Sequence, residues 1–191
     1  HGRATCVAGS TWPSDLRILE GAWPAVRLAN PDARLIIAPH EPTPAHLTPI
    51  DEWIARMGWT GARLGADGAA SADVVVVDRL GVLGDLYALA SIAYVGGAFH
   101  AAGLHSVLEP AAFGAPVLFG PRYTGSREAS LLIEAQGGRA VENARTLQEA
   151  LLLWLTNEGA RAAAGSRARA MVQDGLGAAQ RSAALVASLL A

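Results

Sequence analysis

The sequence contains no lysine: all fifteen of its basic residues are arginine. Alanine is abundant, and we interpret both features first as genomic composition bias and only second as a functional choice. Only 17% of the residues are charged, and the formal net charge is −2. A broad nucleic-acid-binding face is basic, so the slightly negative net charge argues against nucleic acid as a partner. A local basic site is still compatible with this net charge.

Cysteine and long apolar runs are scarce as well. The one cysteine, Cys6, cannot form an internal disulfide, and a single thiol supplies no cysteine-based zinc site. It lies in an apolar run, so we expect it to be buried and inert. No apolar run approaches the roughly 18 residues that cross a membrane, so we expect a soluble chain. The first residues resemble neither a signal peptide nor a methionine start, which is compatible with a piece of a longer protein.

Short apolar runs alternate with helical patterns along the 191 residues, a length that suits one domain or at most two small ones. We expect strands at 5–8, 35–38, 62–64, 74–77, 92–95, 117–119 and 139–141. We expect helices from about 14, at 44–57, at 84–90, near 109, at 126–136, and two or three over 146–191. Pro24 should end or kink the first helix. Leu185, Val186 and Leu189 have a spacing that predicts a helix packed on the sheet.

This alternation predicts an α/β fold, a Rossmann-like doubly wound parallel sheet with helices on both faces and further helices at the C-terminus. The four valines at 74–77 support it, because a continuous β-branched run is typical of a strand buried on both sides. Ligands of such folds bind beyond the carboxyl ends of the strands. The loops after five predicted strands should therefore meet at one edge.

The loop and helix between Gly103 and Pro110 form the strongest candidate site. Amides of a loop and a helix N-terminus can hold a phosphate, and the Glu109 carboxylate can accept hydrogen bonds from a ribose diol. A glutamate near a helix N-terminus also favours the helix dipole, so a structural role for Glu109 stays open. Gly97 and Gly103 permit close approach of a phosphate or serve ordinary turns, and no complete GxGxxG is present.

Other candidates follow the remaining strands. The hydroxyls of Ser10 and Thr11 either donate to a phosphate or cap the next helix. His40 and Glu41 follow the second strand, in a loop position typical of binding residues, or are ordinary surface residues. Arg122 either faces a negatively charged ligand or is a solvated arginine.

Several kinds of site find no support. His100 and His105 share one loop, but no carboxylate completes a metal-ligand spacing, so we expect no metal. No nucleophile elbow and no Walker loop occurs. We therefore expect no catalytic residue of those kinds and no cofactor.

Five blocks of the sequence resemble the C-terminal half of the 3-deoxy-D-manno-octulosonic acid (Kdo) transferases, glycosyltransferases of family 30. The blocks stand in the order of that family and cover most of the chain. They are Gly9–Pro13 (GSTWP), Ile37–Glu41 (IAPHE), Gly96–Phe99 (GGAF), Gly103–Pro110 (GLHSVLEP) and Gly114–Pro121 (GAPVLFGP).

The resemblance implies one half of a two-domain GT-B fold. Residues 1–191 would be a single domain that binds the donor CMP-Kdo, with the N-terminal acceptor domain absent. That other domain would bind the lipid A precursor of lipopolysaccharide and supply the catalytic base, in an inverting transfer without a metal. The full-length enzyme would work at the cytoplasmic face of the bacterial inner membrane. The chain alone should bind nucleotide weakly and not catalyse transfer.

The resemblance also assigns roles to residues. Glu109 would bind the ribose, and the backbone from Gly103 through His105 to Ser106 would hold the phosphate with Ser10 and Thr11.

His40 and Glu41 would line the donor cleft. The chain departs from the family at Ser106, where asparagine is usual, and at Leu104, where many members have glycine.

Two other readings stay open: a UDP- or GDP-dependent GT-B enzyme or epimerase, and a non-catalytic nucleotide-binding module.

Overall fold

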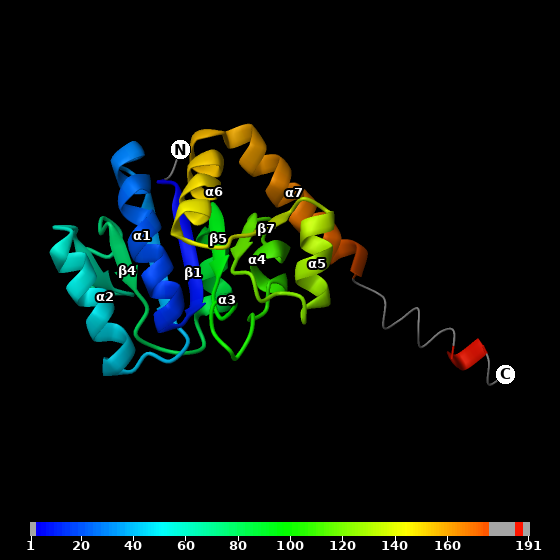
Figure 1. Ribbon diagram of the computed structural model, residues 1–191, viewed down its shortest axis with the longest axis horizontal. Helices are drawn as coiled ribbons and strands as arrows, with labels where there is room; N and C mark the ends of the chain where they lie inside the picture. Colours follow the sequence, from blue (N-terminus) through cyan, green and yellow to red (C-terminus); the bar gives the residue numbers. More distant parts are fainter. Residues whose placement is uncertain (1–2, 176–185, 189–191) are drawn as a thin grey trace.

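The computed structural model describes residues 3–175 and 186–188, and its described strands form one seven-stranded sheet with helices on both sides (Figure 1). All neighbouring strands are parallel, in the order β3-β4-β2-β1-β5-β6-β7. The strands are β1 (Thr5–Thr11), β2 (Arg34–Pro39), β3 (Gly61–Arg63), β4 (Val74–Val76), β5 (Ile92–Val95), β6 (Val117–Phe119) and β7 (Gly138–Ala140). The predicted Rossmann-like doubly wound sheet is confirmed.

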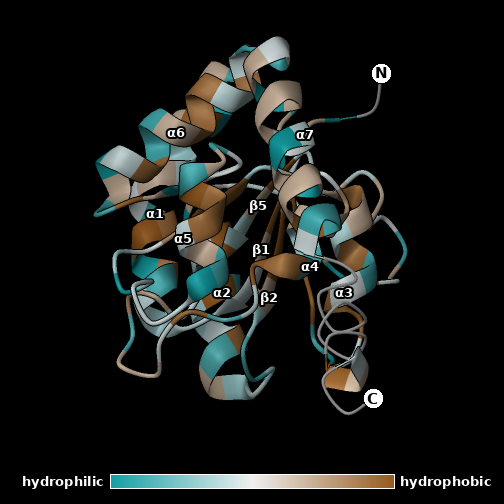
Figure 2. Ribbon diagram, turned by 90° about the vertical axis from the view of Figure 1, so that its right-hand side faces the viewer, coloured by the Kyte–Doolittle hydropathy of each residue, from teal (hydrophilic) through white to brown (hydrophobic). Residues whose placement is uncertain are grey.

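The helices form two layers around the sheet. They are α1 (Pro13–Ala29), α2 (Pro44–Arg56), α3 (Leu83–Leu86), the 3-10 helix η1 (Tyr87–Leu89), α4 (Leu108–Ala112), α5 (Arg127–Glu134), α6 (Ala144–Thr156) and α7 (Glu158–Gly175). In Figure 2, α1, α2 and α6 lie on one side of the central strands, and α3 and α4 lie on the other. Helices α5 and α7 pack with β6 and α4 around a third apolar cluster.

Each central strand is buried on both faces. In β1, Cys6 and Ala8 pack in the cluster with α1, whereas Val7 packs in the cluster with α3 and η1. This two-sided burial explains why the strands are continuous apolar runs rather than alternating ones. Cys6 is fully buried, as expected, and burial raises the pKa of its thiol to about 12.

The first helix does not end at Pro24, one of the two effects expected of this proline: α1 continues to Ala29. Proline removes one hydrogen bond inside a helix. Leu19 and Trp23 precede Pro24 in the sequence, and Val26 follows it. The side chains of these three residues are buried in the core and hold this stretch of helix in place.

The C-terminal prediction is confirmed for α6 and α7, and the segment carrying Leu185 and Leu189 lies outside the described residues. The helix expected at 84–90 consists of the short α3 followed by η1. No helix in the described part of the chain has the length and apolarity of a membrane span.

The strand order reverses between β1 and β5. From β1 the chain runs to β2 on one side, and β5 lies against the other side of β1, with Gly9 opposite Val95. A crevice forms at such a switch point, outside the carboxyl ends of the strands. The loops after β1 and β5 therefore form the two walls of the expected site.

A buried carboxylate connects these two loops. Asp15, in the first turn of α1, is fully buried. It accepts hydrogen bonds from the backbone N–H of Trp12 (2.9 Å), the backbone N–H of Gly97 (3.0 Å) and the hydroxyl of Tyr94 (2.7 Å). Burial and then the negative charge of Asp15 raise the pKa of Tyr94 well above its ordinary value, so this hydroxyl stays a donor. No motif in the sequence pointed to a role for Asp15.

We predict that Asp15→Asn destabilises the chain. The amide nitrogen would face one of three buried donors and leave it without an acceptor, which costs about 1–3 kcal/mol. Urea denaturation followed by circular dichroism measures this loss. As a matched control, the same change at the exposed Asp67 should shift the unfolding free energy by less than about 0.5 kcal/mol. Equal unfolding midpoints for Asp15→Asn and the parent would contradict the role given to Asp15.

Candidate functional site

A cavity of 460 Å³ opens at the carboxyl edge of the sheet. Its wall comes from the end of β1, from α3 and η1 with the residues before them, and from the loop and helix after β5. The lining residues are Ser10, Gly81, Leu83, Gly84, Tyr87, His105, Ser106 and Glu109. The structure thus brings together Ser10, His105, Ser106 and Glu109 from the residues that the sequence predicted.

Ser10 has an unusual backbone conformation. Its φ is 53°, in the left-handed region that is unfavourable for residues other than glycine. The pairing of β1 with β2 shifts register between Gly9 and Thr11, so Ser10 is the extra residue of a β-bulge. Bulges beside active sites re-aim a side chain, and strained backbone gathers at functional sites.

Neither Ser10 nor Thr11 caps α1. The N-cap is Trp12, whose N–H is bound by Asp15. The Thr11 hydroxyl is buried and donates to the Ala38 carbonyl at 3.5 Å, so it does not face the cavity as a free donor. The capping interpretation is therefore wrong for both residues, and Ser10 alone of the two lines the cavity.

Two glycines shape the loop after β5. Gly97 has a φ of 97°, and a Cβ there would lie 2.2 Å from the Gly103 carbonyl oxygen, so the position requires glycine. The loop folds back on the strand end, since the N–H of His105 donates to the Gly96 carbonyl at 3.3 Å. Gly97 and Gly103 therefore form the loop that presents His105 and Ser106, rather than lining the cavity themselves.

Glu109 is exposed on α4, opposite α3. A Cβ added to Gly84 would lie 3.8 Å from its Oε2 atom. Burial and then the charge of Glu109 raise the pKa of Tyr87 above its ordinary value, so the Tyr87 hydroxyl remains protonated. Since α4 has only five residues, the macrodipole expected for this helix is small, and the loop amides become the main candidates for holding a phosphate.

Aromatic rings stack beside the cavity. The Trp12 ring stacks on His100 (centroids 4.1 Å apart) and on His40 (4.6 Å), and its Nε1–H donates to the Nε2 of His105 at 3.3 Å. The rings of His40 and His105 are 4.6 Å apart. Burial and then the nearby His40 lower the pKa of His105, while Asp15 opposes this shift. The lowered pKa favours the neutral ring, which accepts the Trp12 hydrogen bond.

Glu41 and Arg122 lie outside the cavity wall. Both are exposed, and the Arg122 backbone N–H donates to the Ala98 carbonyl at 3.1 Å. The cavity residues that the sequence analysis missed are Gly81, Leu83, Gly84 and Tyr87. They follow β4 in the chain, beyond its carboxyl end, where ligands of such folds bind.

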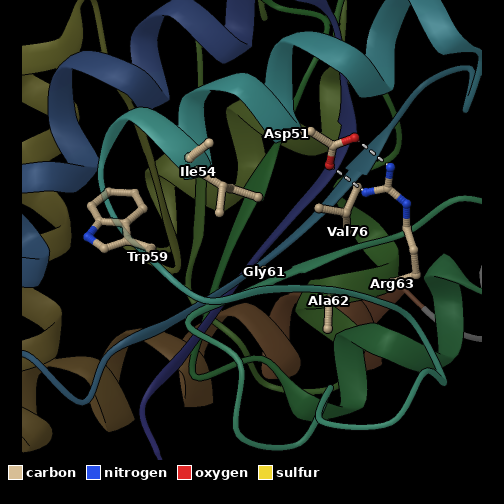
Figure 3. A pocket seen from close by; sticks show the side chains of 8 residues that line it. Asp51, Ile54, Trp59, Gly61, Ala62, Arg63 and Val76 are labelled. Carbon is tan, nitrogen blue, oxygen red and sulfur yellow. Dashed lines mark hydrogen bonds and ion pairs between the residues drawn. The ribbon is translucent and has the colours of Figure 1, made fainter.

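A second cavity, of 380 Å³, lies at the β3 edge of the sheet (Figure 3). Asp51 and Arg63 line it and form two hydrogen bonds of 2.7 and 2.6 Å. Because these charges neutralise each other, the cavity offers no unpaired charge to a nucleotide. Across residues 3–175 and 186–188, no group of three His, Cys, Asp or Glu side chains has an arrangement suited to a metal ion.

Comparison with known proteins identifies sequence relatives. The chain is 30% identical over 138 residues to the 3-deoxy-D-manno-octulosonic acid transferase of Aquifex aeolicus, an alignment that covers 72% of this chain and 38% of the relative. It is 32% identical over 160 residues to that of Chlamydia trachomatis, covering 80% of this chain and 35% of the relative. The chain thus spans little more than a third of the length of these curated relatives. No protein-family model matches it.

The fold matches a solved domain. The crystal structure of the C-terminal CMP-Kdo binding domain of WaaA from Acinetobacter baumannii superposes with a TM-score of 0.78 at 24% identity, covering 91% of both chains. Sequence and fold thus agree with the resemblance drawn from the sequence blocks. The chain belongs to the 3-deoxy-D-manno-octulosonic acid transferase family, and its fold is that of the C-terminal half of a GT-B glycosyltransferase.

Proposed function

We propose that the cavity between Ser10 and Glu109 binds the nucleotide of CMP-Kdo, and that the chain is the donor-binding half of a glycosyltransferase. This enzyme would transfer Kdo to a lipid A precursor in the synthesis of the lipopolysaccharide core. The observation that carries the proposal is the meeting of a carboxylate, two hydroxyls and a glycine-shaped loop around one cavity at the switch point. The names of the relatives and of the matched domain support it.

The cavity offers a partner for each part of a nucleotide. Glu109 would accept hydrogen bonds from the ribose hydroxyls. Ser10, Ser106 and the amides of their loops would hold the phosphate. Leu83 and Tyr87 provide an apolar wall for the base, and a volume of 460 Å³ suits a ligand of this size.

The chemistry of transfer fits such a site. CMP leaves as a phosphate monoester, so negative charge develops on its phosphate in the transition state. Preorganised N–H and O–H donors stabilise developing charge, and the proposal therefore assigns this task to the loops, with no metal and no cofactor. The donors Ser10 and Ser106 line the cavity on loops that Asp15 and Gly97 hold in place.

The acceptor side of the reaction belongs to the whole enzyme. A base within hydrogen-bond reach must activate the acceptor hydroxyl, and we assign that role to no residue of this chain. The proposal places the base and the lipid A precursor site in a second domain, at the cytoplasmic face of the inner membrane. We propose no nucleic-acid partner for this enzyme.

We predict that the chain binds CMP in preference to UMP and GMP, and that Glu109→Ala weakens CMP binding about tenfold or more. A hydrogen bond to a charged group contributes about 1.5–3 kcal/mol, and tenfold in affinity corresponds to about 1.4 kcal/mol. Isothermal titration calorimetry measures both effects. Glu52→Ala, an exposed glutamate on α2, serves as control and should leave the affinity unchanged.

A preference for UMP or GMP would replace CMP-Kdo by another nucleotide sugar. Equal affinities for Glu109→Ala and the parent would remove Glu109 from the ribose site.

We predict opposite effects of Ser10→Gly on stability and on binding. Glycine relieves a left-handed strain of about 1–2 kcal/mol but costs about 0.5–1 kcal/mol in chain entropy. The unfolding free energy should therefore rise slightly, whereas loss of the hydroxyl should weaken CMP binding several-fold. Ser10→Ala, which removes the hydroxyl and keeps the strain, is the matched control and should weaken binding without any gain in stability.

Urea denaturation and calorimetry on the same samples measure the two quantities. If Ser10→Gly binds CMP as tightly as the parent, the hydroxyl does not contact the phosphate.

A further inference from the structure

Three imidazoles meet at the carboxyl edge of the sheet, beside the nucleotide cavity. His40 follows β2, whereas His100 and His105 belong to the loop after β5; we call these three residues the histidine cluster. Trp12 holds them together by stacking on His40 and His100 and by donating its Nε1–H to His105. Contacts from three separate loops fix the positions of the rings.

The contacts of the rings decide which nitrogens are free. The Nε2 of His105 accepts from Trp12, so a neutral His105 carries its proton on Nδ1. The Nδ1 of His100 accepts from the backbone N–H of Ala102 at 3.1 Å, so a neutral His100 carries its proton on Nε2. Each ring therefore presents an N–H donor, and neither N–H has an acceptor in residues 3–175 or 186–188.

No carboxylate pairs with the histidine cluster in the described part of the chain. The charge of Asp15 acts on His105, but the Asp15 oxygens already accept from Trp12, Tyr94 and Gly97. A group of N–H donors without an acidic partner suits a negatively charged ligand.

The histidine cluster continues the cavity on its phosphate side. His105 belongs to both, because its side chain contacts Trp12 and His40 and also lines the cavity with Ser10 and Ser106. Ser10 and Trp12 are two residues apart at the end of β1. A group attached to the far side of a bound phosphate would therefore reach the imidazoles.

We propose that His40, His100 and His105 form an anion subsite that binds the carboxylate of the transferred sugar acid. This inference rests on the proposed function, which makes the sugar an acid. A second phosphate, as in a nucleoside diphosphate, has similar acceptor chemistry and is the competing occupant. The subsite would orient the sugar and let the domain distinguish a charged sugar from a neutral one.

The test compares three probes on the parent and on the double variant His40→Gln/His100→Gln. The probes are CMP, CDP and freshly prepared CMP-Kdo, and the readout is the dissociation constant from a rapid titration of tryptophan fluorescence. We expect the double variant to lose about tenfold in affinity for CMP-Kdo, the effect of one charge-assisted hydrogen bond. Its affinity for CMP should change less than twofold.

His46→Gln is the matched control, since His46 lies on α2 and its Nδ1 contacts the Glu41 carbonyl rather than the histidine cluster. It should change none of the three affinities. Each single glutamine variant is measured as well, with a thermal melt, so that a folding defect in the double variant does not decide the result.

Four outcomes would overturn the inference. A loss for CDP but not for CMP-Kdo would assign the subsite to a second phosphate. Equal losses for all three probes would make the cluster a support of the nucleotide cavity. Unchanged affinity for CMP-Kdo, with CMP still bound, would remove the subsite and leave the proposed function intact. If the parent bound no nucleotide at all, the proposed function would fail and this inference with it.

Discussion

The Asp15 carboxylate is the contact on which the geometry of the site depends. It is fully buried and accepts three hydrogen bonds, two from backbone groups of the loops after β1 and β5 and one from Tyr94. A buried charge is costly unless donors surround it, so the loops are bound to the positions that satisfy it. The positions of Ser10 and Ser106 are fixed because the Asp15 hydrogen bonds hold the loops that carry these two residues.

The strand order of the sheet brings together the two loops that Asp15 connects. β1 and β5 are neighbours in space but about 80 residues apart in sequence, and only the reversal of strand order brings their ends together. Gly96 and Gly97 make the approach possible, because a Cβ at Gly96 would lie 2.4 Å from the Ser10 carbonyl oxygen. The loops after β1 and β5 approach so closely that only glycine, which has no side chain, fits at position 96.

Much of the fold follows from local sequence. The strands at 92–95 and 117–119 agree with the structure residue for residue, because each is a short apolar run that a glycine ends, Gly96 after the first and Gly120 after the second. Pro24 does not end α1, because a local rule ignores the core contacts of Trp23 and Val26. The end of β1 was also misjudged, since the bulge at Ser10 depends on its pairing with β2.

The site was predicted in part for a similar reason. Ser10, His105, Ser106 and Glu109 stand in recognisable blocks after strands. Tyr87 and Leu83 reach the cavity only through the packing of α3 and η1, and the sequence gives them an apolar pattern like any core residue. The role of Asp15 is a tertiary property: its partner Gly97 lies 82 positions away.

The first measurement to make is a crystal structure of the chain with CMP. We expect the ribose hydroxyls to lie within hydrogen-bond distance of the Glu109 carboxylate and the phosphate to lie beside Ser10 and Ser106, with the three Asp15 hydrogen bonds in place. CMP bound elsewhere, for instance in the cavity of Asp51 and Arg63, would contradict it. So would CMP in the expected cavity with the Asp15 contacts broken, because the nucleotide would then not depend on the constraint that shapes the site.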